Sequence, residues 1–347
     1  MIVNKVMMVA KLMFLLAWIL VMTGCRRSDP VKEKEEDQKV ETPSDIDPGF
    51  KINTNPAWKT GNPVFLSGGP GAFDATAVKD PSIVFADGKY HLFYTGMDKG
   101  VGGQWKTGYV SASSIEGLKT ATPRTLMTSL DGGGYFCAPQ VFYYTPERKW
   151  YLIYQSGRGA TFSTTTNISD PNSWIAGQSM GFGDGIDFWL VSDGKDSMFC
   201  FYSAQDGSRT IKRRGTSAKT FPYFWSGFSV VADNTFEAVH VYKNKPDGKY
   251  YMIVEDIARH FELWVADTPG GNWTKLQENW AAKTNLTETA GHWTDQVSHG
   301  EIIRSGFDEN MKIDNINKCD ILIQGVVNSN YGDYANIPYR LGVIKNY

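Results

Sequence analysis

Residues 78–96 read VKDPSIVFADGKYHLFYTG, and this stretch sets the pattern for most of the chain. An apolar run leads into Asp-Gly, a dipeptide that favours a tight two-residue turn, and an aromatic run follows. The segment is therefore predicted to form a β-hairpin. An acidic residue, Asp80, stands at the head of its first strand.

The same pattern returns four more times along the chain. The further units are APQVFYYTPERKWYLIYQ from Ala138, DFWLVSDGKDSMFCFYSAQDG from Asp187, EAVHVYKNKPDGKYYMIVED from Glu237 and HGEIIRSGFDENMKIDNINKCDILIQG from His299. Their starts lie roughly 50 to 60 residues apart, the length of a four-stranded blade with its loops. The repeat predicts an all-β fold, a five-bladed β-propeller over residues 53–347. A β-sandwich, the alternative, does not explain a repeat of this length.

The first 25 residues have the features of an export signal. Lys5 and Lys11 precede the apolar run LMFLLAWILVM, which ends at TGC with Cys25. Small residues before a Cys resemble the bacterial lipobox, in which the Cys is acylated after cleavage. We expect an exported protein that is lipid-anchored through Cys25 at the bacterial cell envelope, at the outer membrane or cell surface. A plain cleaved signal, giving a secreted protein, is the alternative.

Residues 26–52 are predicted to form a flexible linker between this signal and the propeller. They are rich in Lys, Glu, Asp and Pro and have almost no aromatic residues, so they cannot bury enough apolar surface to fold alone. The whole chain has a formal net charge of -2. It lacks the basic excess that attracts phosphate backbones, which argues against nucleic acid as a partner.

The propeller prediction brings together residues that are distant in sequence. The innermost strand of every blade lines the central channel, so the five heads, Asp80, Ala138, Asp187, Glu237 and His299, should meet at one end of it. Each acid alone has a structural reading, as a turn, a loop cap or an edge charge. Crowding three acids costs free energy unless their pKa values shift or a cation binds, and this favours a functional site.

Paired carboxylates across a pocket suit the hydrolysis of a glycosidic bond. One carboxyl must be protonated to donate to the leaving oxygen while the other is ionised, and a third can raise the pKa of the acid. The segments VKDPSIV, GIDFWL, FEAVHVYK, YYMIVED, GHWTDQVSHGEIIR and NYGDYANIPYRLGVI resemble glycoside hydrolase family 62 over almost all of residues 73–347. That family contains α-L-arabinofuranosidases that remove arabinose side chains from arabinoxylan.

The resemblance implies roles for the three acids. Asp80 matches the general base that activates water for inverting attack, Asp187 matches the residue that orients the acid and tunes its pKa, and Glu237 matches the general acid. An inverting enzyme should hold the carboxyl groups of its acid and base roughly 6.5 to 9.5 Å apart.

The resemblance also implies residues that bind substrate and metal. Lys79 and Tyr334 match positions that hold the arabinose, and a calcium ion is expected in the channel near His299. Calcium prefers oxygen ligands, so His299 would act through water. Trp105, Trp174, Trp189 and Trp293 are candidates either for stacking on xylan or for packing between blades.

The chain departs from the family pattern at two places. Phe188-Trp189 stands where Gln-Thr is common, and His240 stands where Gln is common. Phe188-Trp189 is expected to reshape the pocket wall, and both changes are expected to affect the leaving-group specificity more than the hydrolysis. Two other functions stay open: an arabinofuranosidase or xylosidase of the family 43 type, and a carbohydrate-binding propeller without catalytic activity.

Overall fold

The computed structural model describes residues 46–98, 105–126, 135–330 and 332–347. The predicted signal, Cys25 and most of the predicted linker lie outside these residues. The last part of that linker is described, and it contacts the propeller: the Asp47 amide donates to the Pro246 carbonyl at 2.6 Å, and Phe50 and Ile52 pack against the core. Within the described residues, no helix combines the length and the apolar character that crossing a membrane requires.

The first three sheets are four-stranded antiparallel blades. Blade 1 contains β2 (Ala77–Ala86), β3 (Lys89–Met97), β4 (Trp105–Ala112) and β5 (Arg124–Thr125). Blade 2 contains β6 (Phe136–Tyr144), β7 (Lys149–Ser156), β8 (Gly159–Thr165) and β9 (Gln178–Ser179). Blade 3 contains β10 (Gly185–Ser192), β11 (Ser197–Ala204), β12 (Ile211–Ser217) and β13 (Ser229–Ala232).

The last two sheets have five strands each, because they recruit segments from elsewhere in the chain. Blade 4 contains β14 (Glu237–Asn244), β15 (Tyr250–Glu255), β16 (Phe261–Ala266), β17 (Thr274–Ala281) and the short β20 (Lys312–Ile313). Blade 5 contains β19 (Ser298–Ile302), β21 (Asp320–Gly325), β22 (Arg340–Lys345), β1 (Trp58–Thr60) and β18 (Leu286–Glu288). The described helices are short 3-10 turns: η2 (Glu116–Thr120), η4 (Thr145–Glu147), η5 (Lys283–Asn285), η6 (Asn328–Asn330) and η7 (Tyr334–Asn336).

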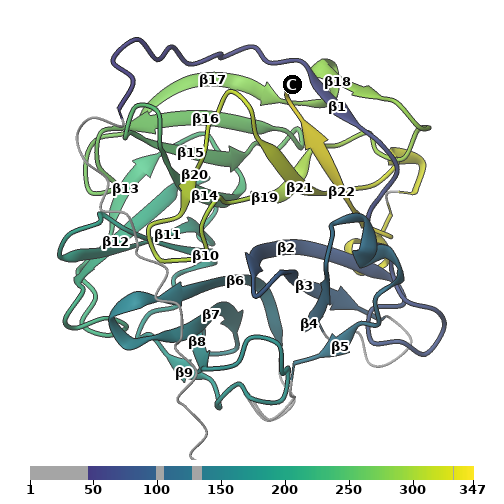
Figure 1. Ribbon diagram of the computed structural model, residues 1–347, viewed down its shortest axis with the longest axis horizontal. Coiled ribbons are helices and arrows are strands. Elements are labelled where there is room, and N and C mark those ends of the chain that lie inside the picture. The colour runs from purple at the N-terminus through teal and green to yellow at the C-terminus, as the bar shows by residue number, and fades with distance from the viewer. Residues whose placement is uncertain (1–45, 99–104, 127–134, 331) are drawn as a thin grey trace, which may run out of the picture. The chain divides into compact units, whose positions relative to one another are not determined.

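The five sheets surround a common centre, with β2, β6, β10, β14 and β19 innermost (Figure 1). Each of these strands contacts the next one along the chain, and β19 contacts β2, so the inner strands form a closed ring. The predicted five-bladed β-propeller is therefore confirmed. Aromatic and aliphatic side chains from neighbouring blades fill the spaces between the sheets.

The ring is closed by pairing between the two ends of the domain. Strand β1 pairs antiparallel with the C-terminal strand β22 and parallel with β18. Trp58 anchors this strand: its side chain is fully buried, its indole N–H donates to the Trp280 carbonyl at 2.7 Å, and the two indole rings pack edge to face at 5.0 Å. The start of the domain thus stabilises its end.

This closure makes Trp58 a test of the fold. Replacing Trp58 with Ala should lower the free energy of unfolding by about 3 to 5 kcal/mol, because the cavity opens between β1 and blade 4. Urea denaturation followed by tryptophan fluorescence measures the change. Lys59→Ala, at the exposed neighbouring position of β1, is the matched control and should stay within about 0.5 kcal/mol of wild type. Equal effects of the two changes would contradict the anchoring role.

Candidate active site

Each innermost strand carries a β-bulge near its start. In β2, Asp80 and Pro81 together oppose the single residue Tyr94, and the register shifts in the same way in β6, β10 and β14. The first bulge residue has a left-handed backbone in all four strands, with φ of 49° at Asp80, 50° at Ala138, 56° at Asp187 and 58° at Ala238. Such conformations cost about 1 to 2 kcal/mol each for non-glycine residues and gather at functional sites.

Most of the bulges are tied to the preceding blade by a hydrogen bond. The Asp80 amide donates to Gln324 Oε1 at 2.9 Å, and the Ala138 amide donates to Thr95 Oγ1 at 2.9 Å. The Ala238 amide donates to Asp187 Oδ2 at 3.0 Å. In this way, side chains of neighbouring blades hold the strained backbone in place and satisfy its amides.

The bulges also correct one detail of the sequence prediction. Asp80 and Asp187 occupy the first bulge position, as expected from their equivalent places in the repeat, but in β14 that position belongs to Ala238. Glu237 stands one residue earlier, just before the bulge, at the position that Lys79 occupies in blade 1. In β19 the register shift leaves a single residue, His299, with no residue opposite it. The prediction of the repeat was correct, but Glu237 lies one position before the place in the blade that Asp80 and Asp187 occupy.

A pocket of about 350 Å³ opens at this end of the channel. All six residues predicted for the site line it: Lys79, Asp80, Asp187, Glu237, His299 and Tyr334. Trp105 and seven residues that the sequence did not single out complete the wall; the seven are Tyr135, Cys137, Gln155, Ile186, Gln205, Phe236 and Arg259. Of the four candidate tryptophans, only Trp105 lines this pocket; the other three are buried.

One side of the pocket is built around Asp80. His299 Nδ1 lies 3.2 Å from Asp80 Oδ1, and Lys79 Nζ lies 3.5 Å from the same oxygen. Lys79 Nζ also donates to the Tyr334 hydroxyl at 2.6 Å and lies 4.6 Å from the centre of the Trp105 ring. Burial alone would lower the pKa of Lys79, but the charge of Asp80 and the Tyr334 hydroxyl outweigh it and hold that pKa well above its usual value. Lys79 therefore stays cationic.

The other side of the pocket is acidic and more enclosed. Burial, followed by the charge of Asp187, raises the pKa of Glu237 to about 7. Burial, followed by the charge of Asp80, raises the pKa of Asp187 to about 7 as well. The two carboxyl groups cannot both ionise cheaply. The hydrogen bond from the Ala238 amide favours the charged form of Asp187.

Glu237 also contacts a cation that the sequence did not reveal. Arg259 Nη1 donates to Glu237 Oε1 at 3.1 Å and to Glu255 Oε1 at 2.8 Å. Arg259 lies in the turn between β15 and β16 with a φ of 62°, and nothing in the surrounding sequence indicates that it reaches the pocket. Glu255 was visible only as part of the motif YYMIVED.

The two departures from the family pattern pack against each other beneath the pocket. Phe188, Trp189 and His240 are all buried, and none of them lines the pocket, so the expectation that Phe188-Trp189 reshapes its wall is wrong. The His240 and Trp189 rings are stacked at 4.0 Å, and His240 packs edge-on against His299 at 5.3 Å. Burial, with help from the charges of His299 and Arg304, lowers the pKa of His240 well below its usual value, so its ring is neutral.

The residues around His299 do not form a direct binding site for calcium. Its Nδ1 already faces Asp80, and the oxygen of Gln324 accepts the Asp80 amide. In the described part of the chain, no group of three or more His, Cys, Asp or Glu side chains is placed to hold a metal ion. Calcium requires six to eight oxygen ligands, so these side chains alone do not suit it.

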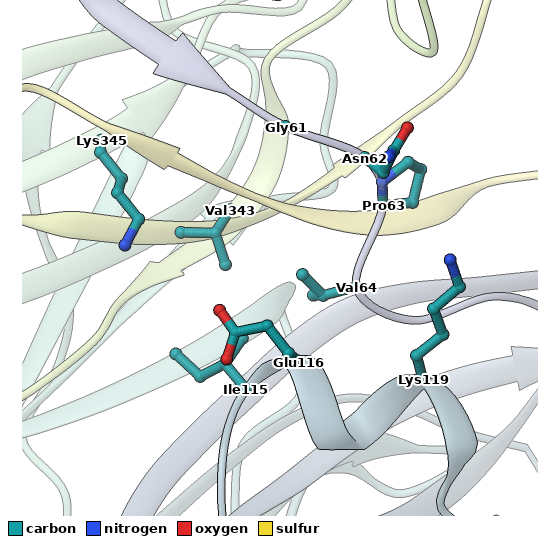
Figure 2. A pocket seen from close by; sticks show the side chains of 9 residues that line it. All are labelled: Gly61, Asn62, Pro63, Val64, Ile115, Glu116, Lys119, Val343 and Lys345. Carbon is teal, nitrogen blue, oxygen red and sulfur yellow. The ribbon is translucent and has the colours of Figure 1, made fainter. Parts of the chain in front are cut away.

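A second hollow, also of about 350 Å³, lies between η2 and the end of β22 (Figure 2). Its lining includes Val64, Ile115, Val343, Glu116 and Lys119. Glu116 is the only carboxylate in that lining. A single acid cannot divide the roles of proton donor and base, so this hollow lacks the chemistry of the central pocket.

A propeller whose central pocket gathers three carboxyl groups, two of them with raised pKa values, has the features of a glycoside hydrolase. A model of glycosyl hydrolase family 62 matches residues 69–345, and the chain belongs to this family. The sequence is 32% identical over 306 residues to alpha-L-arabinofuranosidase C of Cellvibrio japonicus (strain Ueda107). The match covers 83% of this chain and 46% of that protein, so the chain spans about half the length of this relative.

Two solved structures with similar sequences have the same fold. The catalytic domain of a family 62 α-L-arabinofuranosidase from Coprinopsis cinerea superposes with a TM-score of 0.78 at 29% identity, over 85% of this chain and 98% of that one. An α-L-arabinofuranosidase from Podospora anserina, solved in complex with cellotriose, superposes with a TM-score of 0.77 at 31% identity, over 87% and 98%.

The raised pKa of Glu237 predicts a pH-dependent stability. Between the ordinary value of 4.5 and about 7, the folded state holds a proton that the unfolded state has lost, so stability falls as pH rises through this window. Glu237→Gln removes the titration. The free energy of unfolding of the variant minus that of the wild type should therefore increase by about 3 kcal/mol between pH 4.5 and pH 8. Urea denaturation at the two pH values measures this difference. A difference that does not change with pH would contradict the raised pKa.

Proposed function

We propose that the chain is an inverting α-L-arabinofuranosidase that removes single arabinofuranosyl side chains from arabinoxylan. Asp80 is the general base, Glu237 is the general acid, and Asp187 orients Glu237 and sustains its protonation. The proposal extends the family assignment, because membership of family 62 supports the hydrolase activity but does not assign these roles.

The observation that carries this proposal is the difference between the surroundings of the two carboxyl groups. Asp80 faces the cation of Lys79 and the ring nitrogen of His299, which suit a carboxylate that must take a proton from water. Glu237 is enclosed with Asp187 and has a pKa raised to about 7, which suits a group that must donate a proton. In the reaction, Glu237 protonates the departing xylose oxygen. Asp80 deprotonates the water that attacks the anomeric carbon from the opposite face.

The remaining wall residues suit the recognition of one sugar. Lys79 and the Tyr334 hydroxyl present a donor and an acceptor beside Asp80, where they can bind the arabinose hydroxyls. Trp105 and the half-exposed Tyr334 ring pack together at 5.7 Å. Their apolar surfaces can contact the xylose residue that carries the side chain. The pocket volume of about 350 Å³ lies at the small end of the range for ligand sites.

The two alternative functions no longer have equal support. The family match places the chain in family 62, which removes the reason for an assignment to family 43. A propeller that binds carbohydrate without cleaving it stays open as the second function. A binding protein has no need for the raised pKa of Glu237, and this favours the enzyme.

We further propose that the enzyme is exported and held at the bacterial cell envelope by acylation of Cys25. The support is the lipobox-like sequence alone, since Cys25 lies outside the described residues. A Cys25→Ser variant that still partitioned into the membrane fraction would contradict the anchor.

The central experiment follows arabinoxylan hydrolysis by proton NMR. Inversion at an α-linkage predicts that the β anomer of free arabinose appears first, and that the α anomer grows only as the sugar mutarotates. Glu237→Gln should lower kcat by about 10² to 10⁴-fold on this substrate, because the xylose oxygen leaves without a proton.

The control is Glu116→Gln, which changes the acid of the second hollow and should leave the rate unchanged. Xylan binding with no release of arabinose by the wild-type protein would support the binding function. An α anomer formed first would overturn the inverting mechanism.

A calcium ion held through water near His299 stays a prediction that rests on the family resemblance. If it supports the channel, dialysis against EGTA should lower the melting temperature, and added calcium should restore it. An unchanged melting temperature and rate after dialysis would count against a calcium ion in this chain.

A further inference from the structure

Glu255 is a fully buried carboxylate one strand away from the proposed acid. It lies at the end of β15, directly opposite Glu237 in the β14–β15 register. Its Oε1 accepts hydrogen bonds from Arg259 Nη1 and from the Ser298 hydroxyl, both at 2.8 Å, and its Oε2 accepts the His299 amide at 2.9 Å. Both oxygens are therefore engaged, and no part of the side chain reaches the pocket wall.

The position of Glu255 offsets the effect that the charge of Arg259 has on Glu237. A guanidinium 3.1 Å from Glu237 favours the ionised form of that side chain, whereas a general acid must keep its proton. The same Arg259 nitrogen lies 2.8 Å from Glu255, closer than it lies to Glu237. The buried charge of Glu255 thus offsets that of Arg259 in a region where solvent screens little.

We propose that Glu255 is a positioning residue of the reaction, which holds Arg259 beside Glu237 and neutralises its charge, so that the acid remains protonated while its side chain stays oriented. The proposal rests on the proposed function, because it takes Glu237 as the general acid. It adds a role for two residues that do not touch the reacting atoms: Arg259 orients Glu237 with one hydrogen bond, and Glu255 cancels the electrostatic consequence.

The charged and titratable groups around Glu237 come from four blades. Asp187 and Glu255 raise the pKa of Glu237, after burial, while Lys79 and Arg259 lower it. The Tyr334 hydroxyl also faces Glu237, and it stays neutral because its own pKa is raised to about 12, mainly by burial. Removing the charge of Glu255 takes away one group that favours the proton and leaves the charge of Arg259 without its nearest counterion.

The test is the pH profile of kcat/KM on arabinoxylan, whose alkaline limb reports the essential acid of the free enzyme. Glu255→Gln should move this limb to lower pH by about one unit. Arg259→Met should move it to higher pH, and the double variant Glu255→Gln/Arg259→Met should return it close to the wild-type position. Compensation of this kind is expected from balanced charges and not from general damage to the fold.

Two controls separate charge from structure. Ser298→Ala removes a hydrogen bond to the same Glu255 oxygen without changing any charge, so its limb should not move. Glu255→Asp keeps the charge and should restore the wild-type limb. An aryl arabinofuranoside with a dinitrophenolate leaving group needs little protonation, so on this substrate the rate defect of Glu255→Gln at neutral pH should shrink.

If Glu255→Gln leaves the alkaline limb of the pH profile unchanged, or moves it to higher pH, the inference is overturned. If Glu255→Gln does not fold, by circular dichroism, Arg259→Met alone decides, and an unmoved limb in that variant would overturn it. Failure of the proposed function looks different, because Glu237→Gln would then keep its activity. An inactive Glu237→Gln with unmoved limbs in the Glu255 and Arg259 variants would refute only the present inference.

Discussion

The site depends on a hydrogen bond that recurs between blades, from the amide of a bulged residue to a side chain of the preceding blade. The acceptors Thr95, Glu255 and Gln324 occupy the same position in the second strand of their blades. Each one pairs with the residue that comes just before the bulge of its own blade. They receive the amides of Ala138, His299 and Asp80. The last of these bonds joins blade 5 to blade 1. The amide of the proposed base is therefore held by the blade that β1 and β22 complete.

The same ring explains how the fold tolerates the site. Left-handed residues and crowded carboxyl groups both cost free energy, and neither is needed to build a blade. Deeper in the channel, Arg304 offsets part of this cost by linking three blades. Its guanidinium donates to Glu301 at 2.7 Å and to the Val141 carbonyl at 2.7 Å, while Glu301 accepts the Ile83 amide at 3.0 Å. The pocket end of the channel is strained and charged, whereas below it Arg304 and Glu301 are paired with each other and with neighbouring blades.

Much of this architecture could be predicted from the sequence because each blade begins with a local signal. A short apolar strand, a turn and an aromatic strand define the hairpin, and the residue at its head lies at the channel, which was enough to select Asp80, Asp187 and His299. The offset of Glu237 could not be predicted, because a bulge is fixed by pairing with β15 and leaves no mark in β14 itself. Arg259 and Glu255 were missed for a related reason. Their importance comes from contacts across blades, which composition and spacing do not encode.

The offset of Glu237 shows how one repeated backbone supports unequal chemistry. Each of the first four inner strands presents two positions to the pocket, the residue before the bulge and the first residue within it. The residues before the bulge are Lys79, Cys137, Ile186 and Glu237, and all four line the pocket. Within the bulge, Asp80 and Asp187 also reach it, whereas Ala138 and Ala238 have no polar side chain to offer. Because the proposed acid uses the first position and the proposed base uses the second, their carboxyl groups leave the backbone from different points of the bulge and meet different partners. The division of roles thus follows from which side chain stands at each position, and the propeller fold supplies the positions alone.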